Sequence, residues 1–464
     1  MYAKGACTDE VTADPRVECG TLTVPEDRTK PDGRTVILPV AIVHTTDPNP
    51  APDPVVYLSG GPGFAGVTAA ASFAKNNYTG NHDAIVFDQR GTGRADPSLV
   101  CPEVYDANAT INGAVQTFAA AEKLYVDAAV ACRDRLQATG IDLNQYNTAT
   151  VADDLADLRV AMGFKEWNLF GVSYGTTVAL ATMRTHPEGI RSVTIDSVLP
   201  TDAEMTAAKA VADFDRVERV FFDGCAQDAA CHARFPNLEA DFHDAIAALD
   251  ASPYATTFAD PTSKKTTPFL VDGPAAVSGF FNALYDSNLI PALPGIIEQI
   301  KAGTAGPILD ALVSQLGETI NGAAEAQKDA VNCSDRASSI RTGDVGGLLA
   351  EHPDYSLFLI GYSVCASFGV APAPRGFNDP VRSDIPTLVL ADEYDPITPP
   401  DQSRHASETL SHSTFVLFPG LGHGAVFSDR ECPGAIFRAF VTAPTAAVDT
   451  SCVASMGPPQ WNVN

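Results

Sequence analysis

Basic side chains are scarce in this chain of 464 residues. It holds 30 Lys and Arg against 57 Asp and Glu, which gives a formal net charge of -27 at pH 7. A surface of that sign repels phosphate groups, so nucleic acid is not an expected partner and anionic membrane surfaces are disfavoured. The acidity has two interpretations: it keeps the protein soluble, or it helps to attract a cationic substrate such as a peptide with a free amino terminus.

Long apolar runs are also missing. No stretch reaches the roughly 18 apolar residues that a membrane-spanning helix needs, so membrane insertion is not expected. The start, Met1-Tyr2-Ala3-Lys4, leads directly into polar sequence and does not resemble a signal peptide. If the protein is exported, we expect this chain to be a mature form with an added start. The sequence does not reveal the oligomeric state, and a monomer is favoured.

The ten cysteines form no CxxC pair, and no His accompanies them at zinc-site spacing, so no metal site is predicted. Their even number favours disulfides and an oxidising compartment, although ten buried free thiols remain the alternative. Sequence alone does not establish the connectivity. The most economical pairing joins sequence neighbours: Cys7 with Cys19, Cys101 with Cys132, Cys225 with Cys231, Cys333 with Cys365, and Cys432 with Cys452.

Short apolar runs alternate with helical patterns at both ends of the chain. Strands are predicted at 21–24, 35–43, 55–58, 84–87, 167–170, 192–195, 387–391 and 414–418, and helices at 115–138, 150–162, 176–185 and 433–441. This alternation is typical of a doubly wound, mostly parallel sheet. Between 201 and 383 the pattern is mainly helical, without a convincing run of strands. We therefore predict an α/β core from 1–200 and 384–464, the latter with a C-terminal tail, and a helical cap inserted at 201–383.

The strongest chemical motif is Gly171-Val172-Ser173-Tyr174-Gly175, which follows a predicted strand and precedes a predicted helix. That context is the one in which G-x-S-x-G forms a sharp turn that projects the serine hydroxyl above the sheet. We therefore predict Ser173 as a nucleophile and an α/β-hydrolase fold.

A serine nucleophile needs a base, which a third group orients. In this fold the acid and then the histidine follow the serine along the chain, each after a later strand. Asp395 follows the strand at 387–391, and His423 follows the next strand within Gly420-Leu421-Gly422-His423-Gly424. We predict a triad of Ser173, Asp395 and His423. Asp392 and Glu393 compete with Asp395 as the acid, and Asp392 is the first alternative.

Acyl transfer also needs donors for the oxyanion. The backbone N–H of Tyr174, directly after the nucleophile, is one candidate, and Gly61 in the loop Ser59-Gly60-Gly61-Pro62-Gly63 is the other. Gly91-Thr92-Gly93 follows a strand but lacks the spacing of a dinucleotide-binding loop, so no cofactor is predicted.

These motifs resemble the prolyl and tripeptidyl aminopeptidase group of α/β-hydrolases. The similarity extends to Asp88-Gln89-Arg90-Gly91-Thr92-Gly93, and the segments Asp395-Pro396-Ile397-Thr398-Pro399-Pro400 and Asp449-Thr450-Ser451-Cys452 are similar to its actinobacterial tripeptidyl-aminopeptidase branch. The resemblance implies the same triad, a helical cap over the site and acidic residues that bind the substrate ammonium. Asp335 and Glu204 are candidates for those acids. Ser59 stands where prolyl aminopeptidases usually have His, which argues against strict proline selectivity.

The resemblance further implies a secreted or cell-envelope enzyme that removes residues or short peptides from amino termini. The substrate would be a small peptide or a small-molecule ester or amide. Two alternatives remain. The same triad would serve an esterase, lactonase or small-molecule amide hydrolase, and the fold could be a catalytically silent binding protein. The silent protein would be expected to have lost a triad position, and none is lost.

Overall fold

The computed structural model describes residues 1–7, 11, 14–259, 265–336 and 345–463, and the side chains of 315–321 are left out of the description. A nine-stranded sheet with the order β1-β2-β3-β5-β4-β6-β7-β10-β11 organises it. Its strands are β1 (Tyr2–Gly5), β2 (Val17–Pro25), β3 (Thr35–Val43), β4 (Val55–Leu58), β5 (Ala84–Phe87), β6 (Trp167–Val172), β7 (Ile190–Asp196), β10 (Thr387–Asp392) and β11 (Ser413–Phe418).

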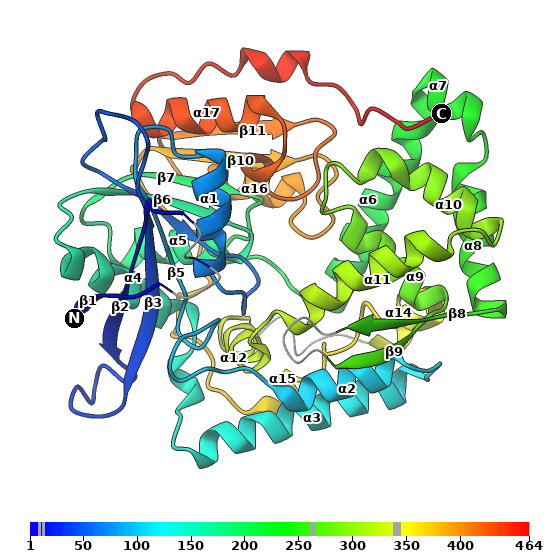
Figure 1. Ribbon diagram of the computed structural model, residues 1–464, viewed down its shortest axis with the longest axis horizontal. Helices are drawn as coiled ribbons and strands as arrows, with labels where there is room; N and C mark the ends of the chain where they lie inside the picture. The colour runs from blue at the N-terminus through cyan, green and yellow to red at the C-terminus, as the bar shows by residue number, and fades with distance from the viewer. Residues whose placement is uncertain (8–10, 12–13, 260–264, 337–344, 464) are drawn as a thin grey trace.

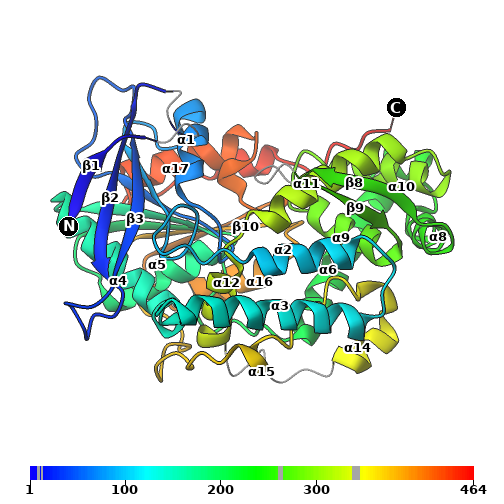
Figure 2. The same cartoon turned by 60° about the horizontal axis from the view of Figure 1, so that its bottom comes forward.

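The six strands from β5 to β11 in this order run parallel, and β1, β2 and β3 join them as an antiparallel edge. Helices α1 (Ala70–Asn76) and α17 (Glu431–Thr442) cover one face of the sheet. Helices α4 (Thr148–Met162), α5 (Tyr174–Thr185) and α16 (Pro400–Ser407) cover the other (Figure 2). The predicted α/β fold with a mostly parallel sheet is confirmed.

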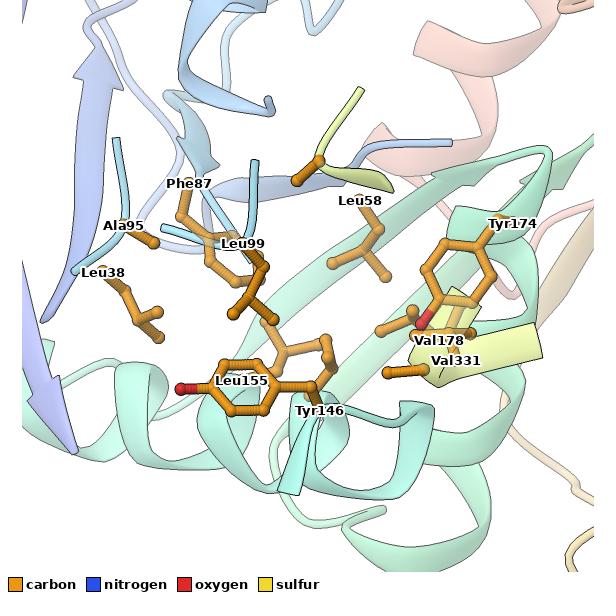
Figure 3. Close-up of a cluster of buried hydrophobic side chains, with 14 of the residues drawn as sticks. Leu38, Leu58, Phe87, Ala95, Leu99, Tyr146, Leu155, Tyr174, Val178 and Val331 are labelled. Atoms are coloured by element: carbon orange, nitrogen blue, oxygen red, sulfur yellow. The ribbon is translucent and has the colours of Figure 1, made fainter. Parts of the chain in front are cut away.

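Neighbouring residues of the central strands alternate between two hydrophobic clusters. Val55 of β4 packs in the cluster under α1 and α17, whereas Val56 packs in the cluster under α4 and α5. Because successive strand side chains point to opposite faces, a strand that is buried on both faces is apolar throughout. Figure 3 shows Leu38 of β3 and Val178 of α5 in the second cluster, which also takes in Val331.

The segment 201–383, which we call the insert, is mainly helical as expected (Figure 1). Its helices are α6 (Ala207–Gln227), α7 (Ala229–Arg234), α8 (Leu238–Ala251), α9 (Gly273–Ala283), α10 (Leu293–Lys301), α11 (Gly306–Asn321), α12 (Glu325–Asp335), α14 (Val345–Glu351) and α15 (Cys365–Phe368). An antiparallel hairpin of β8 (Tyr254–Ala259) and β9 (Thr266–Val271) was not predicted. Its exposed positions include Ala255, Ala259 and Pro268 as well as two threonines, so the two strands show no clear alternation of apolar and polar residues.

Two parts of the insert pack differently. Helices α6, α8, α9 and α10 build a separate hydrophobic cluster, which also takes in Tyr394 and Trp461 from outside the insert, whereas α12 and α15 pack into the cluster beneath the sheet. Helices α2 (Pro102–Asn112) and α3 (Phe118–Ala138) precede the insert in the chain, yet α2 contacts β9 and α3 contacts α12 and α15. Helices that precede the insert therefore pack against it, and helices of the insert pack under the sheet. Contacts thus cross the proposed boundary between core and cap in both directions.

All five disulfides join sequence neighbours, as predicted: Cys7–Cys19, Cys101–Cys132, Cys225–Cys231, Cys333–Cys365 and Cys432–Cys452. Cys101–Cys132 links the start of α2 to α3, and Cys333–Cys365 links α12 to α15. Across the described residues, no helix combines the length and apolar character needed to cross a bilayer.

Candidate active site

Ser173 lies at the carboxyl end of β6, at the turn into α5. Its backbone has φ 58° and ψ -128°, a conformation that L-residues rarely adopt. Such strain persists only where the surrounding structure enforces it, and it is concentrated at functional sites. The turn places Ser173 beside the amino terminus of α5, whose first N–H groups have no partner within the helix.

The two glycines of the motif are required by close approach. A Cβ on Gly171 would lie 2.4 Å from the carbonyl oxygen of Gly175, and a Cβ on Gly175 would lie 2.0 Å from the carbonyl oxygen of Leu58. Both distances are far below van der Waals contact. The glycines therefore let β6, α5 and β4 crowd together at the turn that carries Ser173.

Asp395 is fully buried after β10, and four groups bind its carboxylate. Oδ1 accepts hydrogen bonds from the backbone N–H groups of Ile397 (2.9 Å) and Thr398 (2.8 Å), and Oδ2 accepts one from the Thr398 hydroxyl (2.7 Å). His423 Nδ1 lies 2.8 Å from the same Oδ2. Although burial alone would raise the pKa of Asp395, His423 and these donors hold it below its ordinary value.

The bond to Asp395 orients the His423 ring. It assigns the proton of the neutral imidazole to Nδ1, which leaves Nε2 as the acceptor. Burial on its own would lower the pKa of His423, but the charge and hydrogen bond of Asp395 outweigh it and raise that pKa above its ordinary value. No hydrogen bond joins Ser173 to His423 in the described part of the chain, though both line one cavity. Such bonds are often formed only with substrate present.

Two buried acids at the carboxyl ends of β7 and β10, Asp196 and Asp392, support the loop that carries His423. The Asp196 carboxylate accepts the N–H groups of Ala425 (3.2 Å) and Val426 (2.9 Å). Ser197 accepts the N–H of Gly424 (2.8 Å) and donates to Asp392 Oδ2 (2.9 Å).

The alternative acid of the triad, Asp392, is thus hydrogen-bonded to Ser197 and not to His423. Burial, together with the nearby Asp196 and Asp395, raises the pKa of Asp392 well above its ordinary value. Because His423 bonds to Asp395 and Asp392 bonds to Ser197, the geometry favours Asp395 as the acid.

The insert also makes hydrogen bonds to the loop that carries His423. The Tyr285 carbonyl accepts the N–H of His423 (3.0 Å), and the Ser287 hydroxyl accepts the N–H of Gly422 (2.9 Å). The Tyr285 ring packs against the His423 ring with centroids 4.9 Å apart. Arg216 of α6 donates to the carbonyl oxygens of Glu393 and Asp395. The insert therefore braces both loops that carry the acid and the base.

The glycine-rich loop after β4 lies against the nucleophile. A Cβ on Gly60 would lie 2.9 Å from the Cβ of Ser173, and Gly61 has φ 112° and lines the cavity with Ser173. Gln89 donates to the carbonyl and the hydroxyl of Ser59 and so fixes the base of this loop. The Tyr174 side chain is buried, and its hydroxyl lies 2.8 Å from the Thr148 hydroxyl. Of the two predicted oxyanion donors, Gly61 lines the cavity with Ser173, and Tyr174 directly follows Ser173 in the chain.

The cavity has a volume of about 680 Å³, within the usual range for small-molecule sites. Its walls come from the glycine-rich loop, the Ser173 turn, the His423 loop and the insert residues 279–289 together with Leu312. Asp286 is the one acid among the lining residues. Neither acid suggested by the resemblance lines it: Asp335 is buried near Arg336, and Glu204 accepts from the Thr206 hydroxyl.

A second pocket of about 320 Å³ adjoins the cavity and shares Gly61, Phe64 and Asn282 with it. Glu325 and Lys328 of α12 line this pocket and form an ion pair. The Tyr125 hydroxyl donates to Glu325 (3.2 Å), and Lys328 donates to the Tyr125 oxygen (3.1 Å). Charged groups thus lie next to the cavity, at a place that the sequence did not indicate.

The run Asp88 to Gly93 serves the fold. Arg90 is fully buried and binds Asp154 through two hydrogen bonds of 2.7 Å, and Asp88 accepts the N–H groups of Val67 and Arg94.

Among the described residues, one group of possible metal ligands lies close together: Cys101, Glu103 and Cys132. Both cysteines are in a disulfide and therefore offer no thiolate.

Sequence reasoning missed Thr398, Ser197, Tyr285, Ser287 and Gln89. Thr398 lies three residues after Asp395 in a segment already singled out, so its role had a local signal. Ser197 and Ser287 act on a loop more than a hundred residues away, and no local pattern marks such contacts.

Comparison with known proteins agrees with the fold. A family described as the alpha/beta hydrolase fold matches residues 53–429. The chain is 27% identical over 472 residues to the tripeptidyl aminopeptidase of Streptomyces lividans, covering 94% of this chain and 83% of that protein. It is 25% identical over 445 residues to serine protease Hip1 of Mycobacterium tuberculosis (89% and 83%). It is 31% identical over 140 residues to the proline iminopeptidase of Xylella fastidiosa (30% of each).

Proposed function

Because this chain belongs to the α/β-hydrolase family, we propose that Ser173, His423 and Asp395 act together as its nucleophile, base and acid. The family match and the named relatives together identify the chain as a hydrolase. Those relatives include an aminopeptidase and a serine protease. The observation that carries the proposal is the 2.8 Å bond from the buried Asp395 to His423, which lines the same cavity as Ser173.

In the proposed reaction, Ser173 Oγ attacks the scissile carbonyl carbon while His423 Nε2 takes the hydroxyl proton. The N–H groups of Gly61 and Tyr174 stabilise the resulting oxyanion. The carbon–nitrogen bond then breaks, and His423 donates its proton to the leaving amine, which leaves an acyl group on Ser173. A water molecule repeats the attack with His423 as base, releases the acid product and restores Ser173.

More narrowly, we propose an exported exopeptidase that releases residues or short peptides from substrate amino termini. Two carboxylates support a site for the substrate ammonium: Asp286 lines the cavity, and Glu325 lines the adjoining pocket. Five disulfides are typical of proteins in oxidising compartments, which supports export. The net charge of -27 favours approach of a cationic peptide end.

The test compares Ala-Ala-Ala-p-nitroanilide with a free and with an acetylated amino terminus, and both with p-nitrophenyl acetate. We expect acetylation to lower kcat/KM by about tenfold or more, because a hydrogen bond to a charged group contributes about 1.5–3 kcal/mol. Asp286→Asn and Glu325→Gln should each reduce this preference, with Glu204→Gln as the matched control. Strong ester turnover without amide cleavage would reject the peptidase and favour an esterase.

A further inference from the structure

A small apolar cavity lies inside the insert, beside the cavity that holds Ser173. It has a volume of about 60 Å³, and the described side chains that line it are Ala, Val, Leu, Ile or Phe, apart from one glycine. The lining residues come from α8, β9, α9, α10 and α11, which pack together within the insert (Figure 1). Protein interiors contain few voids larger than a water molecule, so a cavity of this size needs a reason.

The two cavities share one wall. Gly279 and Ala283 of α9 and Leu312 of α11 line both of them. Since Gly279 and Ala283 lie one helical turn apart, they present a strip of small residues at this wall. The apolar cavity is thus separated from the catalytic cavity by a thin part of α9.

Gly279 has no structural requirement for glycine. It lies within α9, its φ is not in the left-handed region, and a Cβ placed on it would have no neighbour within 4 Å. Glycine inside a helix is less stable than alanine. The residue therefore weakens the helix without serving a turn or a close contact, and its effect is to leave open space between the two cavities.

We propose that this apolar cavity is a specificity subsite that receives an aliphatic side chain of the substrate past Gly279. The proposal rests on the proposed function, because it takes Ser173 as the reacting residue. A volume of about 60 Å³ is four to six times the roughly 10–15 Å³ that one water needs, and it is smaller than the about 150 Å³ of a cavity known to hold benzene. Val, Leu, Ile and Met match this size, and polar or charged side chains would be left without hydrogen-bond partners.

The test uses Ala-Ala-Ala-p-nitroanilide and the three peptides that carry Leu at one position each. We expect Leu to be preferred over Ala at one position by about tenfold or more, the range by which apolar pockets discriminate added methylenes. Ala245→Leu fills the cavity from α8 and should bring this ratio close to one. Ala240→Leu adds the same side chain to the exposed side of α8 and should leave the ratio unchanged.

Gly279→Ala is the second variant, because its methyl group enters open space and favours the helix. It should reduce the Leu preference and preserve or raise the melting temperature. The same comparison is made with two esters, p-nitrophenyl acetate and p-nitrophenyl 4-methylpentanoate, of which only the second carries a branched aliphatic group. If no amide is cleaved, the exopeptidase proposal fails, while the ester ratio still tests the subsite. The absence of an aliphatic preference in both series, or a wild-type ratio in Ala245→Leu and Gly279→Ala, would overturn it.

Discussion

The buried hydroxyl of Ser287 accepts a hydrogen bond from the backbone N–H of Gly422 at 2.9 Å. The next residue along that loop, His423, donates its own N–H to the carbonyl of Tyr285. A Cβ on Gly422 would lie 2.3 Å from the carbonyl oxygen of Leu284, so glycine is what allows this approach. The proposed base is therefore positioned by the insert as well as by the sheet.

Ser287→Ala should lower kcat by about tenfold or more and change KM little. The variant leaves a buried N–H without an acceptor, at a cost of about 1–3 kcal/mol, next to the ring that must reach Ser173. Steady-state kinetics with one amide substrate measures it, and Ser411→Ala, on an exposed loop, is the matched control. A wild-type kcat in Ser287→Ala would show that the insert does not position His423.

Asp395→Asn and Asp392→Asn should differ sharply. Asparagine at 395 offers His423 the wrong hydrogen-bonding partner, and the corresponding loss in a serine protease triad is about 10⁴-fold in kcat. Asparagine at 392 keeps an oxygen that can accept the Ser197 hydroxyl and stands where no bond to His423 is made, so activity should stay within a few-fold of wild type. Comparison of kcat for the two variants at neutral pH is the measurement. The opposite ranking would identify Asp392 as the acid.

Activity should fall as the pH drops through the pKa of His423, at a midpoint above about 6.5, the ordinary value for histidine. The reason is that Asp395 raises this pKa and that only the neutral imidazole accepts the serine proton. The contribution of this pair to the free energy of unfolding depends on pH in the opposite direction. The charged pair stabilises the fold below the ordinary pKa, and this contribution is lost as the pH rises through the raised one. A pH profile of kcat/KM tests the shift, and a midpoint below 6 would contradict it.

The parallel sheet and the three candidate triad positions could be predicted because each rests on local sequence. Ser173, Asp395 and His423 each follow an apolar run that becomes a strand, β6, β10 and β11 respectively, and glycines flank two of the three. Parallel strands bring their carboxyl ends to one edge of the sheet, so chain order alone brings the three residues near each other.

The supporting contacts could not be predicted, because they join segments that are distant in sequence and have no repeated pattern. Ser287 and Gly422 are 135 residues apart, and Ser197 and Gly424 are 227 apart. The guesses Asp335 and Glu204 failed to line the cavity for the same reason: side-chain direction within the insert depends on how its helices pack. Asp286 and Glu325, which line the two pockets, follow no motif.

Removal of single disulfides should destabilise the protein more for the longer loop, with a loss that grows with the logarithm of loop length. By the chain-entropy relation, Cys333→Ala/Cys365→Ala, with a separation of 32 residues, should lose about 3–4 kcal/mol of unfolding free energy. Cys225→Ala/Cys231→Ala, with a separation of 6, should lose about 2 kcal/mol. Urea unfolding of both double variants measures these losses. Equal losses, or a larger one for the short loop, would contradict the expectation.

In the proposed reaction Ser173 forms the covalent intermediate. To test this, the wild-type protein, Ser173→Ala and His423→Ala are treated with a serine-directed fluorophosphonate, and the adduct is located by peptide mass spectrometry. We predict one adduct, on Ser173 of the wild type, a much slower reaction in His423→Ala, and neither adduct nor amide turnover in a folded Ser173→Ala. An adduct on another residue, or substantial turnover by Ser173→Ala, would contradict the claim.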